Sequence, residues 1–123
     1  MLVTDNPAEA VDGTDFVYTD VWVSMGESDT DWATRVPLLL PFRVTPELMA
    51  ASGISTTKFV HCLTALHNTD TELGRRLHDQ FGLDGAEVSN DVFESSSSIV
   101  FDQAENRLHT IKAVLVNALG RGR

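Results

Sequence analysis

Short apolar runs alternate with helix-start signals along this chain, and this alternation limits the folds that it can adopt. At Asn6 and at Thr45 a capping residue precedes a proline, and a glutamate follows in the first turn, which is typical of a helix N-terminus. Residues 16–19 and 58–62 are apolar runs that favour strands. Strands that alternate with helices form a parallel sheet with right-handed crossovers. We therefore predict an α/β fold.

Weaker patterns complete a predicted sheet of three or four strands. Residues 2–4 and 42–44 favour two further short strands. Residues 30–39 favour a helix that Pro37 should kink or end, because proline removes a backbone donor. Ser89 is a candidate cap for a short turn of helix.

Two longer helices have clear amphipathic patterns. The first follows the capping-box spacing of Thr69 and Glu72, ends at Gly82, and has an apolar face made of Leu73, Leu77 and Phe81. The second covers residues 103–119 and is stopped by Gly120. Its apolar positions recur at helical spacing and are Ala104, Leu108, Ile111, Leu115 and Ala118.

Length and composition are those of one soluble globular domain. The 123 residues are 42% apolar and 22% charged, which allows a modest core and argues against disorder. No apolar run approaches the roughly 20 residues that span a bilayer, and no signal-peptide pattern opens the sequence. The single Cys62 cannot form an internal disulfide. These features predict a cytoplasmic protein without a membrane partner.

The net charge of −9 argues against nucleic-acid binding, because phosphates need basic surface. The acidic residues that precede the first base, Arg35, are Asp5, Glu9, Asp12, Asp15, Asp20, Glu27, Asp29 and Asp31. Such a surface favours cationic ligands, or simply keeps the protein soluble.

Candidate chemistry lies where strands end. Asp20, with Ser24 and Met25, could hold an ammonium group, although a carboxylate in this place can equally be a turn residue. Cys62 could be a buried small hydrophobe, and the preceding His61 should point to the opposite face of its strand. The four histidines and one cysteine match no zinc spacing.

Arg107 is the third candidate. It would lie in the first turn of the predicted last helix, where the helix dipole disfavours a cation. A guanidinium there is explained if it faces an anion or a carbonyl oxygen, or if it is solvated surface.

Taken together, these segments resemble ornithine carbamoyltransferases. The matching motifs are Tyr-Thr-Asp-Val-Trp-Val-Ser-Met-Gly at residues 18–26, His-Cys-Leu at 61–63, Phe-Glu-Ser at 93–95, and the stretch 101–114. Their order and spacing also agree with the family over about residues 2–119.

The resemblance implies a truncated, Rossmann-like ornithine-binding domain with a small three-layer parallel sheet. Residues 1–123 would form part of that domain, and the helix at 103–119 would dock on a missing N-terminal domain. The family transfers a carbamoyl group from carbamoyl phosphate to L-ornithine, giving citrulline and phosphate. It is built on trimers, and the resemblance implies neither a metal nor a cofactor.

The family's roles carry over to matching positions as expectations. Asp20 and Ser24 would hold the α-amino end of ornithine, and Met25 would contribute through its backbone. Cys62 would lie beside the reacting amine and, as a catalytic residue, help to place or deprotonate it. On the carbamoyl side, the Leu63 carbonyl would accept from the carbamoyl NH2 and Arg107 would polarise the carbamoyl oxygen.

Two departures from the family pattern matter. The proline that follows His-Cys-Leu in the family is Thr64 here, so we expect a trans Leu63–Thr64 bond and a misplaced Leu63 carbonyl. The Ser-x-Arg-Thr-Arg phosphate loop, the His-Pro-x-Gln motif and the asparagine motif for the ornithine carboxylate are not found in these residues. The resemblance is therefore to the C-terminal portion, which we expect to be inactive by itself.

Two alternatives remain open at this point. The chain could be a non-catalytic remnant that binds a cationic amino acid or docks on a full-length subunit. It could also belong to a carbamoyltransferase with another acceptor, although the Ser24-Met25-Gly26 signature favours an amino acid over a diamine.

Overall fold

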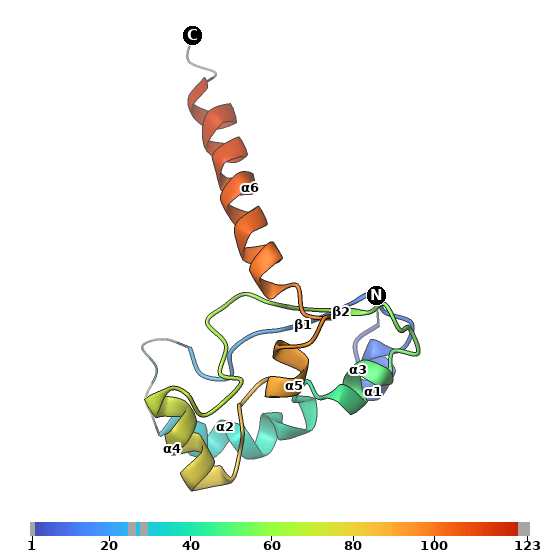
Figure 1. Ribbon diagram of the computed structural model, residues 1–123, viewed down its shortest axis with the longest axis vertical. Coiled ribbons are helices and arrows are strands. Elements are labelled where there is room, and N and C mark those ends of the chain that lie inside the picture. Colours follow the sequence, from blue (N-terminus) through green and yellow to red (C-terminus); the bar gives the residue numbers. More distant parts are fainter. Residues whose placement is uncertain (1, 25–26, 28–29, 121–123) are drawn as a thin grey trace.

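The computed structural model describes residues 2–24, 27 and 30–120, and its centre is a parallel pair of strands. Strand β1 (Phe16–Thr19) pairs with β2 (Lys58–His61), with Phe16 opposite Lys58 and Thr19 opposite His61. Figure 1 shows the chain leaving β1, passing through helices and returning beside it, as parallel pairing requires. The predicted α/β class with a small parallel sheet is confirmed.

The helices are mostly short. Those that lie before β2 are α1 (Pro7–Val11), α2 (Asp31–Leu39), the 3-10 helix η1 (Leu40–Phe42) and α3 (Pro46–Ala50). Those that follow β2 are α4 (Glu72–Phe81), α5 (Asn90–Phe93) and α6 (Val100–Gly120). Among the described residues, no helix is long and apolar enough to cross a membrane.

The predicted helix starts are confirmed by their caps. The Asn6 side chain accepts from the Ala8 and Glu9 amides, and Thr45 Oγ1 accepts from the Leu48 amide. These bonds satisfy backbone donors that a helix leaves free at its first turn. At α4 the cap is Thr71, whose hydroxyl accepts from the Gly74 amide, and not Thr69 of the expected capping box.

Three expected boundaries were wrong. Residues 2–4 form no strand, and in place of a strand at 42–44 the chain makes η1 followed by one isolated bridge between Val44 and Val88. A strand needs a partner that offers a ladder of hydrogen bonds, and sequence pattern alone does not reveal that partner. In addition, α6 begins at Val100, three residues before the predicted start, because the Gln103 amide already donates to the Ile99 carbonyl.

Helix α2 ends shortly after Pro37, as expected, but not at the proline itself. Helix α2 continues for two residues beyond Pro37, and η1 follows it. Ser89 precedes α5 as predicted, although its side chain makes no capping hydrogen bond.

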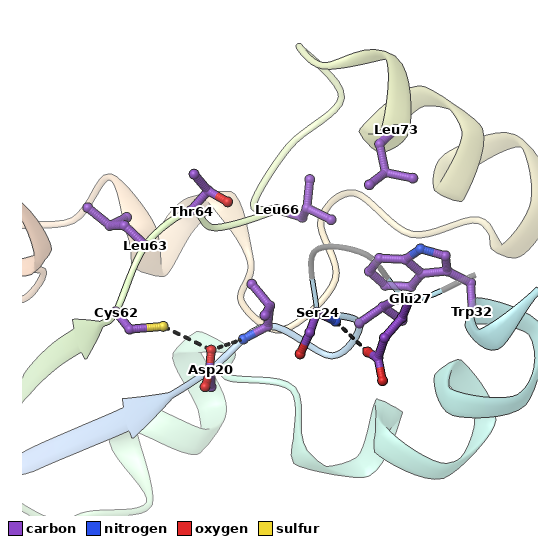
Figure 2. Close-up of a pocket in the computed structure, with 11 residues that line it drawn as sticks. Asp20, Ser24, Glu27, Trp32, Cys62, Leu63, Thr64, Leu66 and Leu73 are labelled. Carbon is purple, nitrogen blue, oxygen red and sulfur yellow. Dashed lines mark hydrogen bonds between the residues drawn. The ribbon is translucent and has the colours of Figure 1, made fainter. Parts of the chain in front are cut away.

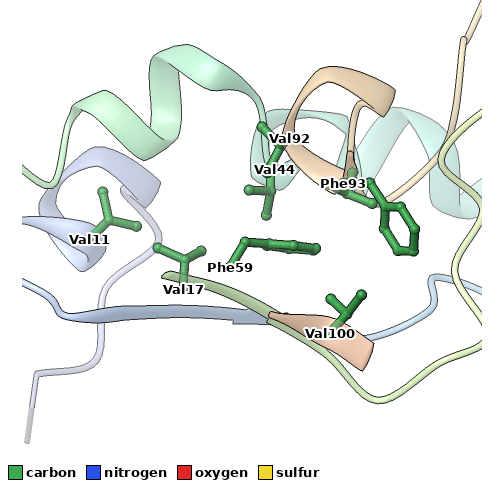
Figure 3. Packing of buried hydrophobic residues seen from close by; sticks show 8 residues of the cluster. Val11, Val17, Val44, Phe59, Val92, Phe93 and Val100 are labelled. Atoms are coloured by element: carbon green, nitrogen blue, oxygen red, sulfur yellow. The ribbon is translucent and has the colours of Figure 1, made fainter. Parts of the chain in front are cut away.

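Two apolar clusters lie under the sheet. Val17 and Phe59 form a directly opposed pair on one sheet face and pack against the helical layer, as Figure 3 shows. The other buried members of this cluster are Val11, Val44, Val88, Val92, Phe93 and Val100. A second cluster joins α2 and α4 and comprises Trp22, Trp32, Val36, Leu77, Leu83 and Ala86.

The opposite sheet face is thinly covered. Phe16 and Tyr18 on β1 are 61% and 57% exposed, and α6 approaches this face near Val60 through Gln103. Figure 1 shows α1 to α5 on one side of the strands and α6 rising away from the other. The second outer layer of the expected three-layer sheet is therefore represented, in the described residues, by the start of α6.

Because the two faces of the sheet differ in burial, we expect a Phe→Ala substitution to lower the free energy of unfolding by different amounts on the two faces. Phe59→Ala should lower the free energy of unfolding by about 3–5 kcal/mol, since the side chain is fully buried and its loss leaves a cavity. Phe16→Ala, on the exposed face, should change it by about 0.5 kcal/mol or less. Urea unfolding followed by the fluorescence of Trp22 and Trp32 measures both, and equal losses would contradict the assignment of the faces.

Candidate functional site

The ends of β1 and β2 bring two predicted site residues together. Asp20 follows β1 and Cys62 follows β2, and the parallel register places these positions side by side. Cys62 Sγ donates to Asp20 Oδ1 over 2.8 Å, and the Val21 amide donates to the same oxygen over 2.7 Å. Figure 2 shows the thiol and the carboxylate facing each other across the strand ends. Residues 42 positions apart in the sequence thus form one polar pair.

The pair has a defined protonation pattern. Burial, followed by the neighbouring Asp20 carboxylate, raises the pKa of Cys62. The hydrogen bond from Cys62 and the Val21 amide lower the pKa of Asp20. Near neutral pH the thiol therefore keeps its proton and donates it, while Asp20 is an ionised acceptor. Burial and the adjacent Cys62 also raise the pKa of Tyr18, which lies beside the pair.

A cavity of about 430 Å³ opens on the Asp20 side of this pair. Asp20, Ser24 and Glu27 supply its carboxylate and hydroxyl groups, and Cys62 and Leu63 lie along its rim. Its apolar lining is made of Val21, Val23, Trp32, Leu66 and Leu73. Figure 2 shows Asp20 and Cys62 at one end, and Trp32, Leu66 and Leu73 at the other, with Glu27 next to Trp32. A ligand with a cationic head and an alkyl chain would match this division.

A second cavity of about 320 Å³ lies between the strand ends and α6. Arg107 and Gln103 reach it from α6, and Tyr18, His61 and Cys62 line it from the strands. Cys62 thus belongs to both cavities. Asp20 and Ser24 line the first cavity, and Arg107 lines the second. Cys62 lies between these two groups of predicted site residues.

Arg107 is not in the first turn of its helix, as the sequence suggested. Because α6 begins at Val100, Arg107 lies about two turns inside it, beyond the reach of the helix-end charge. Its place beside the second cavity, rather than the helix dipole, is what distinguishes it.

The expectation of a trans bond before Thr64 was wrong, because the Leu63–Thr64 bond is cis. The sequence argument considered only the intrinsic preference of one peptide bond. In the folded chain the surrounding loop makes one local and one tertiary hydrogen bond: the Leu63 amide donates to His61 Nδ1, and the Leu66 amide donates to Glu87 Oε1.

His61 and Glu87 support this loop from inside the core. Both side chains are fully buried, and His61 Nε2 lies 3.4 Å from Glu87 Oε1. Because His61 Nδ1 accepts from the Leu63 amide, the ring directs its other nitrogen to the carboxylate. His61 and Cys62 point to opposite sides of the strand, as predicted, so they do not form a base–nucleophile pair.

Sequence reasoning missed several polar residues around the site. Glu87 could have been noticed, since it is an acid between two apolar residues, Ala86 and Val88. Gln103, which accepts from the His61 amide over 3.0 Å, carries no such signal. Met25 lies outside the described residues. No group of three or more histidine, cysteine or acidic side chains in the described part of the chain could hold a metal ion.

The chain belongs to the family described as "Aspartate/ornithine carbamoyltransferase, Asp/Orn binding domain", whose model matches residues 1–118. It is 57% identical over 121 residues to "Ornithine carbamoyltransferase, catabolic" of Rhizobium meliloti (strain 1021). It is 55% identical over 122 residues to the protein of the same name in Chromobacterium violaceum. Both alignments cover 98% of this chain and 36% of the relative, so the chain spans about a third of their length.

Solved structures agree on the fold. The ornithine carbamoyltransferase from Pyrococcus furiosus superposes with a TM-score of 0.70 at 38% identity, covering 90% of this chain and 29% of that one. The anabolic ornithine carbamoyltransferase from Campylobacter jejuni gives a TM-score of 0.71 at 28% identity, covering 94% and 32%. The family resemblance recognised from the motifs is thus confirmed.

The thiol–carboxylate pair predicts a shift in cysteine reactivity. Asp20→Asn removes the negative charge that helps raise the pKa of Cys62, so a larger fraction of the thiol is ionised at pH 8. Alkylation by iodoacetamide should become about threefold to tenfold faster. Cys62 is the single cysteine, so mass spectrometry reports it directly.

Asp5→Asn, which removes the same charge far from the strand ends, is the matched control and should leave the rate unchanged. The pH midpoint of alkylation should move down in Asp20→Asn, yet stay above that of a free thiol because burial remains. An unchanged midpoint would contradict the pairing.

Proposed function

We propose that this chain is the acceptor-binding part of an ornithine carbamoyltransferase. The reaction would transfer the carbamoyl group of carbamoyl phosphate to the δ-amine of L-ornithine, giving citrulline and phosphate. Family membership supports the class, and the names of the relatives support the acceptor. The observation that carries the proposal is the division of the predicted site residues between two cavities that meet at Cys62.

The first cavity would hold the amino acid. An ionised Asp20 would attract the α-ammonium group, and Ser24 would add a second acceptor. Met25 is carried over from the family motif as a backbone contact. The apolar wall would shield the alkyl chain of ornithine, which favours the neutral and nucleophilic form of an amine that is otherwise protonated at neutral pH.

The second cavity would hold the carbamoyl group. The amine nitrogen forms a bond to the carbamoyl carbon, and the bond from that carbon to the phosphate oxygen breaks. The proton that the nitrogen loses is accepted by the departing phosphate. Negative charge grows on the carbamoyl oxygen meanwhile, and Arg107 would stabilise it. Leu63 lines the first cavity, next to Cys62, so its carbonyl would accept from the carbamoyl NH2 only where the carbamoyl group reaches the boundary of the two cavities. Cys62, which lines both cavities, would orient the attacking amine there.

Helix α6 would complete the enzyme by docking. Figure 1 shows it projecting from the body, and Val100 is its one buried residue in the described chain. Leu108, Ile111 and Leu115 are 59%, 49% and 51% exposed on one side of it. We propose that this face packs against the N-terminal domain that the family resemblance implies, since the chain spans only 36% of the length of the relative.

A second candidate is a non-catalytic subunit that docks on full-length enzyme. The exposed apolar face of α6 favours it equally, since that face needs a cover in either case. A trimer-based assembly, which the family resemblance implies, and a cytoplasmic location, which the composition predicts, belong to the proposed carbamoyltransferase function.

Citrulline formation distinguishes the two functions. The 123-residue chain is assayed alone and mixed with the part of the Rhizobium meliloti relative that precedes the aligned region. The chain alone should be inactive, because the phosphate-binding motifs are not among its residues. Activity on mixing supports the carbamoyltransferase. Citrulline formation by the chain alone would contradict the need for a second part. Binding of the two polypeptides to each other without citrulline formation would favour the docking subunit.

In the active mixture, Arg107→Gln should lower citrulline formation about 10²–10³-fold, the loss typical of one transition-state donor. His109→Gln, at an exposed position of the same helix, should leave the rate unchanged. Steady-state rates at saturating ornithine measure both. Equal rates for the two variants would contradict the role of Arg107.

A further inference from the structure

Arg35 joins helix α2 to the wall of the first cavity. Its Nη1 donates to the Trp22 carbonyl and to Glu27 Oε2, each over 2.7 Å, and its Nη2 donates to Glu27 Oε1 over 2.5 Å. Glu27 Oε2 also accepts from the Ser24 amide over 2.6 Å. The guanidinium therefore binds Trp22 and Glu27, which lie on either side of Ser24 in the sequence.

We call the contacts of Arg35 with Glu27 and with the Trp22 carbonyl the Arg35 brace. The part of helix α2 from which Arg35 extends is well packed. Trp32 and Val36, on either side of Arg35 in α2, are buried in the second apolar cluster together with Trp22. Glu27 and Ser24, at the other end, are exposed and line the first cavity. The brace thus connects a packed helix to two exposed polar residues of the cavity wall, Ser24 and Glu27.

The brace also sets the charge of the cavity. Among the residues that the structure describes, two carboxylates, Asp20 and Glu27, line it. Arg35 neutralises Glu27, whereas Asp20 accepts from a thiol and a backbone amide, neither of which is a cation. Asp20 is therefore the carboxylate that remains for a cationic ligand.

We propose that Arg35 is a positioning residue of the acceptor cavity: it binds Glu27 and the Trp22 carbonyl, and so fixes Ser24 in the cavity wall and leaves Asp20 to receive the ligand's ammonium group. The identity of the ligand rests on the proposed function, whereas the brace rests on the contacts alone. Lysine could not replace it fully, because an ammonium group cannot make the two-pronged contact with a carboxylate.

The first test is hydrogen exchange of the Ser24 amide in the 123-residue chain, without ligand. Arg35→Gln should lower Ser24 protection about threefold to tenfold, the range for one local hydrogen bond, and Arg35→Lys should give an intermediate value. The Leu66 amide, which donates to Glu87, is the internal control and should not change. Lys112→Gln removes the same charge from α6 and should leave both amides unchanged.

The pH profile separates the brace from a general loss of stability. The hydrogen bond from Arg35, followed by that of the Ser24 amide, lowers the pKa of Glu27. Ser24 protection in the wild type should persist above that lowered pKa and be lost as the pH falls through it. In Arg35→Gln the loss should begin at higher pH. Asp31, which acts on Arg35, and Asp20, in the same cavity, are the other charges nearby, and Asp31→Asn should leave the order of the two profiles unchanged.

Unchanged Ser24 protection in Arg35→Gln, equal losses at Ser24 and Leu66, or coincident pH profiles would each overturn the inference. A second test measures the affinity of the 123-residue chain for L-ornithine by calorimetric titration. If the wild type binds, Arg35→Gln should bind about threefold to tenfold more weakly, and equal affinity would overturn the positioning role. If the wild type does not bind while Ser24 responds as described, the proposed function fails and the brace stands.

Discussion

The parallel pairing of β1 with β2 is the constraint on which the rest of the site depends. Its register sets Thr19 opposite His61, so that the next residues, Asp20 and Cys62, emerge side by side at the same edge. In an open parallel sheet the carboxyl ends of the strands are where ligands bind, because the loops that follow diverge there. A slip of one residue would exchange the faces of His61 and Cys62 and turn Cys62 away from Asp20, toward the core.

Buried polar groups hold the loops that leave this edge. His61 and Glu87 lie inside the core and bind the Leu63 and Leu66 amides, while Gln103 accepts from the His61 amide. These hydrogen bonds tie the loop after β2 to the core. His61 Nε2 and Glu87 Oε2, which are also buried, have no hydrogen-bond partner among the described residues, and a buried polar atom without a partner is costly. After β1, the ion pair of Arg35 with Glu27 holds the Ser24 amide. This pair lies at the surface, where ion pairs contribute less to stability.

Local signals predicted much of the fold. Asn6, Thr45 and Gly82 mark helix ends through contacts within a few residues, and both strands had clear apolar patterns. The boundaries that were wrong depend on distant partners: Val44 reaches Val88, and α6 begins at Val100, which is buried in the first apolar cluster. For the site, motif order predicted Asp20, Ser24, Met25, Cys62, Leu63 and Arg107. It did not predict the neighbouring polar residues Arg35, Glu87 and Gln103, whose partners lie 8 to 42 residues away.

The sequence by itself determined the α/β class, the positions of the main helices and strands, the family, and the identity of the candidate site residues. Capping, periodicity and motif order are written within short stretches of chain, and so they can be read without a structure. The tertiary structure alone decided that Cys62 lies between two cavities, that the Leu63–Thr64 bond is cis, and that α6 carries an exposed apolar face. These properties depend on which distant groups meet in space, and no local pattern encodes that.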